Sequence, residues 1–255
     1  RHHKHRYDLD SLPDSPYIVT GNVLVNQGVT LTIEAGVEVD FNGYFIHVDG
    51  ALRAEGTASL NVSFTGTAVT NEGNFIVFKS SSIDYDSATD TGNLINHASF
   101  YVKPNGGPGI SGYGADGAIH PFFTGTGGPK ISNSTITSLN GSAIVLRSSG
   151  ALISNNILKG ASSGIDSQGS QGATITNNVI YGSTNGFRCI APPVAFDHNI
   201  LVGTGVGTGI EIETNGSCHA SGKFEYNLIS GYRTGISTTK NPGFSLHYNS
   251  IFNEI

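Results

Sequence analysis

Apolar and polar residues alternate along most of this chain, which is the spacing of strands that bury one face. The alternation begins at Tyr17 and continues through YIVTGNVLV (17–25), VTLTIEAGVEVDF (29–41) and YFIHVDGALRAEG (44–56), with glycines between the runs. Shorter apolar runs follow at 62–65, 74–78 and 94–102. No segment keeps a helical period for more than two turns, so the pattern predicts an all-β protein.

In the second half of the chain the alternation becomes a repeat. Six similar segments begin at Ile131, Ile153, Ile175, Phe196, Phe224 and Leu246, and their spacings are 22, 22, 21, 28 and 22 residues. A second short strand follows after each of the first five segments, at 142–146, 163–167, 185–189, 208–212 and 234–238. A fixed period near 22 residues is typical of a solenoid, in which each coil stacks on the last. We therefore expect a right-handed parallel β-helix with three short strands in each rung.

Stacked rungs place equivalent residues directly over one another. Three inward apolar columns are expected, which contain Ile131, Ile136 and Ile144 and the residues that match them in later rungs. The fourth repeat position is Ser134 in the first repeat. In the others it is asparagine: Asn156, Asn178, Asn199, Asn227 and Asn249. Because an amide both donates and accepts, an inward ladder of these side chains would satisfy buried backbone groups at a corner. The glycines before the third strand suit a corner with a positive φ or a close approach of the backbone.

The chain divides into a polar, His-rich arm at 1–16 and a β-helix at 17–255. Loop excursions from the coil are expected near 80–92, 103–130 and 213–223, which are rich in polar residues and glycine. The repeat stops without an amphipathic helix or a polar cap. An open rung exposes apolar side chains and strand edges, so we expect either further domains of a longer chain or head-to-tail self-association, which would build a filament.

The composition of the chain bears on its possible partners and on its location. Charged residues make up 13% of the chain and the formal net charge is −6, which argues against a nucleic-acid partner. No apolar run is long enough to span a membrane as a helix. The chain contains no methionine, which is consistent with removal of an N-terminal secretion signal. We expect an extracellular or cell-surface protein.

Two cysteines and one acidic loop are the first candidates for covalent or metal chemistry. The long repeat contains Cys218, and its extra length would bring this residue back over Cys189 to form a disulfide; the alternative is two separate thiols. Asp84, Asp86 and Asp90 have the spacing of oxygen ligands for Ca²⁺, although a simple acidic loop explains them as well. The basic RHHKH segment at 1–5 is expected to be a flexible arm rather than a Zn²⁺ or Cu²⁺ site. We expect no required cofactor, with Ca²⁺ as a possible ligand of the chain.

These repeats resemble the right-handed β-helix superfamily, which includes pectate lyases and many secreted surface proteins. The N-terminal runs GVTLTIEAGV (28–37) and GALRAEGT (50–57) resemble the opening rungs of bacterial and archaeal extracellular β-helix proteins. The resemblance implies the fold and secretion. It leaves activity open, because that superfamily contains enzymes, adhesins and structural modules.

Two outward columns are candidates for a carbohydrate or ion site. Asp166, Arg188 and Glu211 occupy consecutive rungs one step beyond an apolar column, as a charge ladder or a sugar-binding cluster would. A second column contains Asp197, Glu225 and His247. The resemblance to pectate lyases implies that stacked carboxylates would hold Ca²⁺ beside a basic residue, but no Arg or Lys follows this column.

Three functional hypotheses follow. The preferred one is a secreted, non-catalytic structural or adhesive solenoid that assembles end to end. The first alternative is a Ca²⁺-assisted polysaccharide lyase that acts along the Asp197 and Glu225 face. The second is a non-catalytic glycan-binding module that uses Tyr226 and Tyr248 beside His198, although packing at a turn also explains these aromatic residues.

Overall fold

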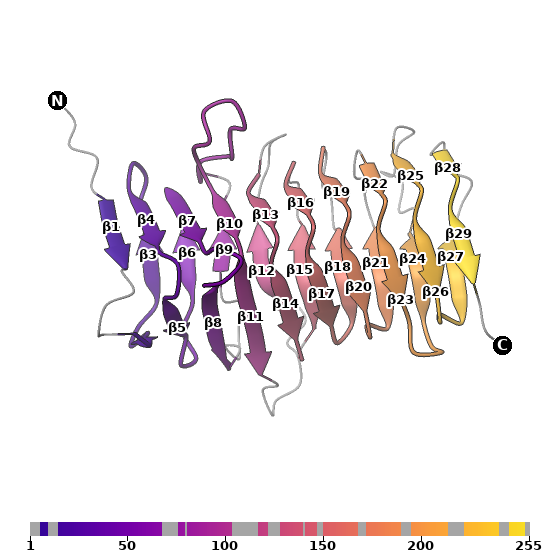
Figure 1. The fold of residues 1–255 in the computed structure, drawn as a ribbon, viewed down its shortest axis with the longest axis horizontal. Helices are drawn as coiled ribbons and strands as arrows, with labels where there is room; N and C mark the ends of the chain where they lie inside the picture. The colour runs from indigo at the N-terminus through magenta and orange to yellow at the C-terminus, as the bar shows by residue number, and fades with distance from the viewer. Residues whose placement is uncertain are drawn as a thin grey trace.

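The chain coils so that each turn adds one strand to each of three long parallel sheets, as Figure 1 shows from β1 at one end to β29 at the other. The computed structural model describes residues 6–9, 15–67, 76–79, 81–103, 117–121, 128–139, 141–146, 150–167, 172–189, 195–213, 222–239 and 245–252. Every regular element in these residues is a strand. The prediction of an all-β parallel solenoid is confirmed.

Each rung passes through the three sheets in a fixed order, which we name sheets A, B and C. Sheet A contains β1 (Arg6–Leu9), β4 (Thr30–Ile33), β7 (Ala51–Glu55), β10 (Leu94–Asn96), β13 (Lys130–Ser132), β16 (Leu152–Ser154), β19 (Thr174–Thr176), β22 (Ala195–Asp197), β25 (Lys223–Glu225) and β28 (Ser245–His247). Sheet B contains β2 (Tyr17–Ile18), β5 (Glu38–Asp40), β8 (Val62–Thr67), β11 (Ala98–Lys103), β14 (Thr135–Ser138), β17 (Ile157–Gly160), β20 (Val179–Tyr181), β23 (Ile200–Val202), β26 (Leu228–Ser230) and β29 (Ser250–Phe252). Sheet C contains β3 (Val23–Val25), β6 (Ile46–Val48), β9 (Ile76–Phe78), β12 (Gly117–Pro121), β15 (Ser142–Leu146), β18 (Ser163–Ser167), β21 (Asn185–Cys189), β24 (Thr208–Ile212) and β27 (Thr234–Thr238).

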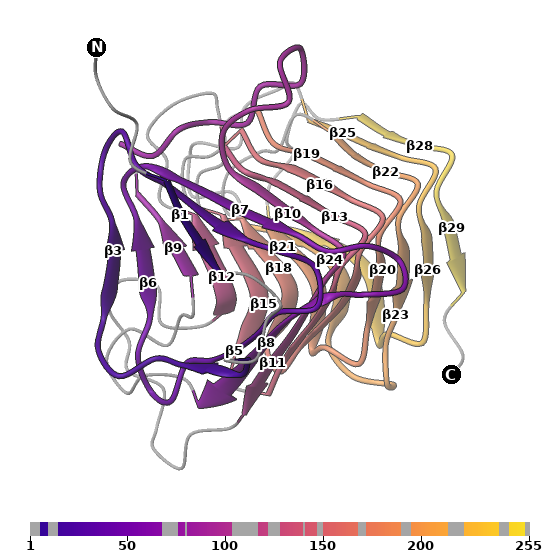
Figure 2. The ribbon, with the colours of Figure 1, turned by 60° about the vertical axis from the view of Figure 1, so that its left-hand side comes forward.

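Figure 2 shows the three sheets enclosing the inside of the coil. The buried apolar residues of all three sheets form one core there. The strand registers pair Ile153 with Ile175 in sheet A, Leu158 with Ile180 in sheet B, and Ile165 with Phe187 in sheet C. All of these side chains are fully buried. Removing such columns from water is the main stabilising contribution to a solenoid, whose rungs contact only their neighbours. The predicted apolar columns are confirmed.

Two segments that were predicted to lie outside the coil belong to it. Arg6–Leu9, in the predicted polar arm, forms β1 and pairs with β4 at the edge of sheet A. Gly117–Pro121, in the predicted excursion at 103–130, forms β12 between β9 and β15. Both errors have one cause. Charged residues in β1 and glycines before β12 hide the strand pattern, and pairing with a neighbouring rung overrides weak local preference.

The glycines predicted to precede the third strand are the second residues of the sheet C strands, and space rather than φ requires them. Gly164, Gly186, Gly209 and Gly235 all lack a positive φ. A Cβ atom on Gly186 would lie 2.6 Å from the carbonyl oxygen of Gly209 and 2.6 Å from Leu201 Cδ2. The adjoining rung therefore fills the volume that a methyl group would need.

Candidate functional site

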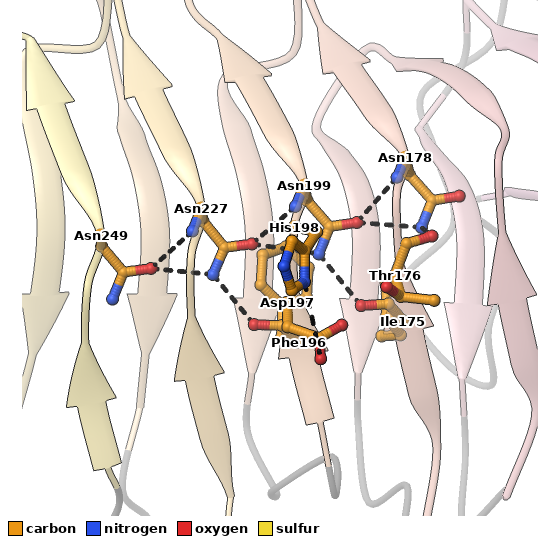
Figure 3. Close-up of polar contacts among 9 residues, drawn as sticks. All are labelled: Ile175, Thr176, Asn178, Phe196, Asp197, His198, Asn199, Asn227 and Asn249. Carbon is orange, nitrogen blue, oxygen red and sulfur yellow. Dashed lines mark hydrogen bonds and ion pairs between the residues drawn. The ribbon is translucent and has the colours of Figure 1, made fainter.

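The inward corner between sheets A and B holds a continuous column of asparagines (Figure 3). Asn178 represents the column. Its Nδ2 donates to Asn199 Oδ1 and to the Ile153 carbonyl oxygen, both at 3.0 Å. Its Oδ1 accepts from the backbone N–H and the Nδ2 of Asn156, also at 3.0 Å. Because Asn156, Asn178, Asn199 and Asn227 are buried and their amides are hydrogen-bonded within the fold, this column supports the corner rather than binding a ligand.

The same pattern extends along the coil in both directions. Asn227 donates from its backbone N–H and from Nδ2 to Asn249 Oδ1, both at 2.9 Å. At the other end, Ser134 donates from its backbone N–H to Asn156 Oδ1 at 3.0 Å, and its own Oγ accepts from the backbone N–H of Ala98 at 3.0 Å. Each rung thus supplies a side-chain oxygen to the backbone of the rung before it.

A charged cluster lies on the outer face of sheet C. The register places Arg188 between Asp166 and Glu211 on adjacent strands. Arg188 Nη1 lies 3.7 Å from Asp166 Oδ2, and its Nε lies 3.7 Å from Glu211 Oε2. The shortest contacts are made to a residue to which the sequence did not point. Arg188 Nη2 donates to both carboxylate oxygens of Glu213 at 3.0 Å.

Burial and charge act in opposite directions on this cluster. Burial disfavours the charged guanidinium of Arg188. The hydrogen bond to Glu213 and the negative charges of the neighbouring carboxylates favour it more strongly, so the pKa of Arg188 is raised. Burial and then the charge of Glu213 raise the pKa of Glu211, which also accepts a hydrogen bond from Asn185 Nδ2 at 2.8 Å. Arg188 therefore places one positive charge among three carboxylates and remains protonated, so it is poorly suited to act as a base.

The second predicted column lies on the outer face of sheet A. Asp197 pairs with Glu225, and Glu225 with His247. Ser245 Oγ donates to Glu225 Oε1 at 3.2 Å, and His198 Nδ1 lies 3.9 Å from Asp197 Oδ2. Asp197 Oδ1 is buried and has no hydrogen-bond partner among the described residues. The carboxylates stand side by side, but no Arg or Lys occupies their column in this part of the structure.

The carboxylates of the acidic loop make local hydrogen bonds. Asp86 accepts hydrogen bonds from Thr89 Oγ1 at 2.8 Å and from the Ala88 N–H at 2.9 Å, and these bonds lower its pKa. The hydroxyl of Tyr85 donates to Asp90 at 2.9 Å, which lowers the pKa of Asp90. Within the described ranges, no three residues of the ligating types come together around a common point. Local hydrogen bonds therefore engage two of these carboxylates, as expected of a simple acidic loop, and Ca²⁺ binding by Asp84, Asp86 and Asp90 stays a prediction.

An aromatic column lies outside the asparagine ladder, at the same corner. His198, Tyr226 and Tyr248 have φ values of 53°, 56° and 57° and follow one another on successive rungs. The ring centroids of His198 and Tyr226 are 5.0 Å apart, and those of Tyr226 and Tyr248 are 4.9 Å apart. Tyr226 is 49% exposed and Tyr248 is 73% exposed. The tyrosines were noted from the sequence, but their left-handed backbone was not predicted.

The remaining candidates fall partly outside the described residues. Cys189 is buried in β21, and Cys218 lies in 214–221, which the structure does not describe, so the disulfide remains a prediction. The histidines at 2, 3 and 5 also fall outside the described ranges. None of the residues that the structure describes forms a helix long and apolar enough to cross a membrane.

Comparison with known proteins agrees with this architecture. The family model for a right-handed β-helix region matches residues 117–254, which is more than half of the chain. The matched segment includes the asparagine column, the charged cluster on sheet C and the aromatic column. No curated protein matches the sequence. The coiled parallel sheets and this match together place the chain in the right-handed β-helix family.

Proposed function

We propose that this protein is a secreted, non-catalytic β-solenoid with a structural or adhesive role at a cell surface. The observation that carries the proposal is the state of Arg188. It is the basic residue stacked between carboxylates, and its guanidinium is bound to Glu213 at 3.0 Å. A lyase needs a base that can take a proton from the substrate, and an ion-paired guanidinium is a poor one.

The surface chemistry also supports an extracellular role. Charged residues make up only 13% of the chain. Such a surface presents a flat, regular array rather than a deep pocket, which suits attachment along a length of polymer better than turnover of a small substrate.

Self-association is a second part of the proposal. Leu246 is 39% exposed and Ile251 is 45% exposed, whereas their counterparts Phe224 and Ile229 on the preceding rung are buried. A further rung of a longer chain or a second copy of this chain would cover these side chains. Light scattering over a range of concentrations distinguishes the two, because only self-association makes the mass rise with concentration.

A polysaccharide lyase is the second candidate, and the register of Asp197 with Glu225 favours it. The test incubates the protein with polygalacturonate and with neutral polysaccharides, with and without Ca²⁺, and measures unsaturated products and new reducing ends. The proposal predicts binding to surfaces without products. Products that disappear in Glu225→Ala but persist in Glu38→Ala, an exposed glutamate on β5, would overturn it.

A further inference from the structure

Three outward columns run side by side along the corner between sheets A and B. Asp197 and Glu225 form the carboxylate column, and Ile200 and Leu228 form the aliphatic column on the sheet B side. The aromatic column of His198, Tyr226 and Tyr248 lies between them. Ile200 is 42% exposed and Leu228 is 39% exposed. Together these columns, which we call the corner strip, present acidic, aromatic and aliphatic groups on the rungs of His198 and Tyr226, and the rung of Tyr248 extends the aromatic column.

Stability does not account for the tyrosines in this strip. The corner position holds Asn133, Asn155 and Asn177 on the earlier rungs, with φ values of 51° to 57°. Asparagine adopts this backbone readily, whereas a bulky side chain costs about 1–2 kcal/mol there. Stacking of each aromatic pair returns about 0.5–1.5 kcal/mol. Tyrosine in place of asparagine at this corner is therefore roughly neutral for folding, and it leaves the rings of Tyr226 and Tyr248 exposed. A strained backbone that does not stabilise the fold points to a role in ligand recognition.

The geometry of the stack leaves ring surface available. Parallel rings touch when their planes are about 3.5–4.0 Å apart. The centroids of Tyr226 and Tyr248 are 4.9 Å apart with an interplanar angle of 11°, so rings that touch at this separation are offset from one another. Each ring therefore leaves part of its face uncovered by the next ring. These exposed ring faces recur once per rung, at about 4.8 Å along the solenoid axis.

We propose that the corner strip binds an extended strand of uncharged polysaccharide that runs along the solenoid axis. This inference rests on the proposed adhesive function and names its ligand. A pyranose has apolar C–H faces that pack on aromatic and aliphatic side chains, and its hydroxyls donate strong hydrogen bonds to carboxylates. One sugar residue of an extended β-linked strand is close in length to one rung.

The charge of the strip selects against acidic polymers. Asp197 and Glu225 are adjacent, and the Asp197 side chain is 33% exposed, so its accessible carboxylate oxygen can accept a hydrogen bond from a ligand. A neutral sugar supplies hydroxyl donors, whereas a uronate brings a like charge next to two carboxylates. The chain as a whole carries a formal charge of −6, which acts in the same direction.

The test measures binding of three neutral β-1,4-linked hexasaccharides, of glucose, mannose and N-acetylglucosamine, and of hexagalacturonate, by titration calorimetry. The variant is Tyr226→Asn with Tyr248→Asn, which installs the residue that earlier rungs carry at the same corner and so preserves the backbone. The matched control is Tyr101→Thr, an exposed tyrosine on β11 whose register partner on the next rung is Thr137.

We expect at least one neutral hexasaccharide to bind, with a Kd that rises about ten-fold or more in the double variant and is unchanged in the control. Failure of all three neutral sugars to bind, or tighter binding of hexagalacturonate, overturns the inference. Binding that the double variant retains also overturns it but leaves the adhesive proposal intact. Cleavage of any sugar instead overturns the proposed function, whatever the variants do.

Discussion

The corner between sheets A and B is built in two ways. In the early rungs it is wide: residues 34–37 separate β4 from β5, Gly36 has a φ of 83°, and the Val37 N–H bonds the Glu34 carbonyl oxygen at 3.2 Å. In the later rungs it is sharp: only Asn177 and Asn178 separate β19 from β20. The wide corner at 34–37 makes a backbone hydrogen bond within itself. The sharp corner takes an oxygen from the next rung, and the asparagine column is the result.

This difference explains why the outer columns are regular only in the later rungs. A shared amide ties each corner to the next, so equivalent residues stay in line and outward side chains stack. Wide corners vary in length, from 34–37 in one rung to 56–61 in the next, and present no continuous corner column. The asparagine column itself supports the corner rather than binding a ligand, but it aligns the outward side chains of the later rungs.

The largest effect is expected from Asn178→Leu. Loss of the amide leaves the Asn156 N–H and the Ile153 carbonyl oxygen buried without partners, so the free energy of unfolding should fall by about 3–5 kcal/mol. The matched control is Asn177→Gly, the exposed neighbour with a φ of 57°, which glycine adopts freely. Urea denaturation gives both values. If the two variants unfold at similar urea concentrations, the ladder does not hold the sharp corner.

A smaller loss is expected from Gly186→Ala. The new methyl group would meet the Gly209 carbonyl oxygen and Leu201 Cδ2, so unfolding should become easier by about 1–3 kcal/mol. Gly21→Ala in the early rungs is the control, because nothing lies within 4 Å of the added atom. Thermal unfolding followed by circular dichroism compares the two. Equal melting temperatures would show that the later rungs are not packed as tightly as described.

The charge cluster on sheet C predicts a dependence on pH. Arg188→Gln leaves Asp166, Glu211 and Glu213 without their cation and should cost about 1–2 kcal/mol at neutral pH, since the group is partly exposed. The folded-state pKa of Glu211 is already raised, so the folded state binds protons more readily than the unfolded one. Stability of the variant should therefore rise as the pH falls from 7 toward 5. A loss that is the same at both pH values contradicts this account.

The smallest effect is expected from Tyr232→Phe, and it should be stabilising. The Tyr232 hydroxyl is buried without a hydrogen-bond partner in the described part of the chain, and burial raises its pKa to about 12. Removing it should add about 1 kcal/mol at neutral pH. The wild type should also lose stability as the pH rises from 10 to 12, because the raised pKa favours the neutral phenol in the fold. The Tyr232→Phe variant should show a smaller alkaline loss, and unfolding at pH 8 and pH 11 measures both effects.

Residues at fixed positions of the repeat can be placed from the sequence. Asp166, Arg188 and Glu211 could be aligned because each follows a buried residue at a fixed step. Glu213 could not, because it opens the insertion in the 28-residue repeat, where the period no longer fixes position. Its spacing of two residues from Glu211 was the available signal, since alternate residues of a strand share a face.

The corner strip shows a second feature that is hard to predict from the sequence, namely the left-handed backbone of its tyrosines. Asn155 and Asn177 precede ladder asparagines, and this pairing indicates a left-handed corner that Tyr226 and Tyr248 inherit by register. Tyrosine is rare in that backbone, so residue preference alone argues against it. The acidic loop shows the same limit, because spacing places Asp86 and Asp90 near one another but does not show which hydrogen bonds use them.

The most direct test of the account is a crystal structure of the protein with a neutral β-1,4-linked hexasaccharide that it binds. The account predicts an intact sugar strand along the solenoid axis, with its rings on Tyr226 and Tyr248 and its hydroxyls on Asp197 and Glu225. A strand bound across sheet C at Arg188, or a cleaved sugar in any position, would contradict it.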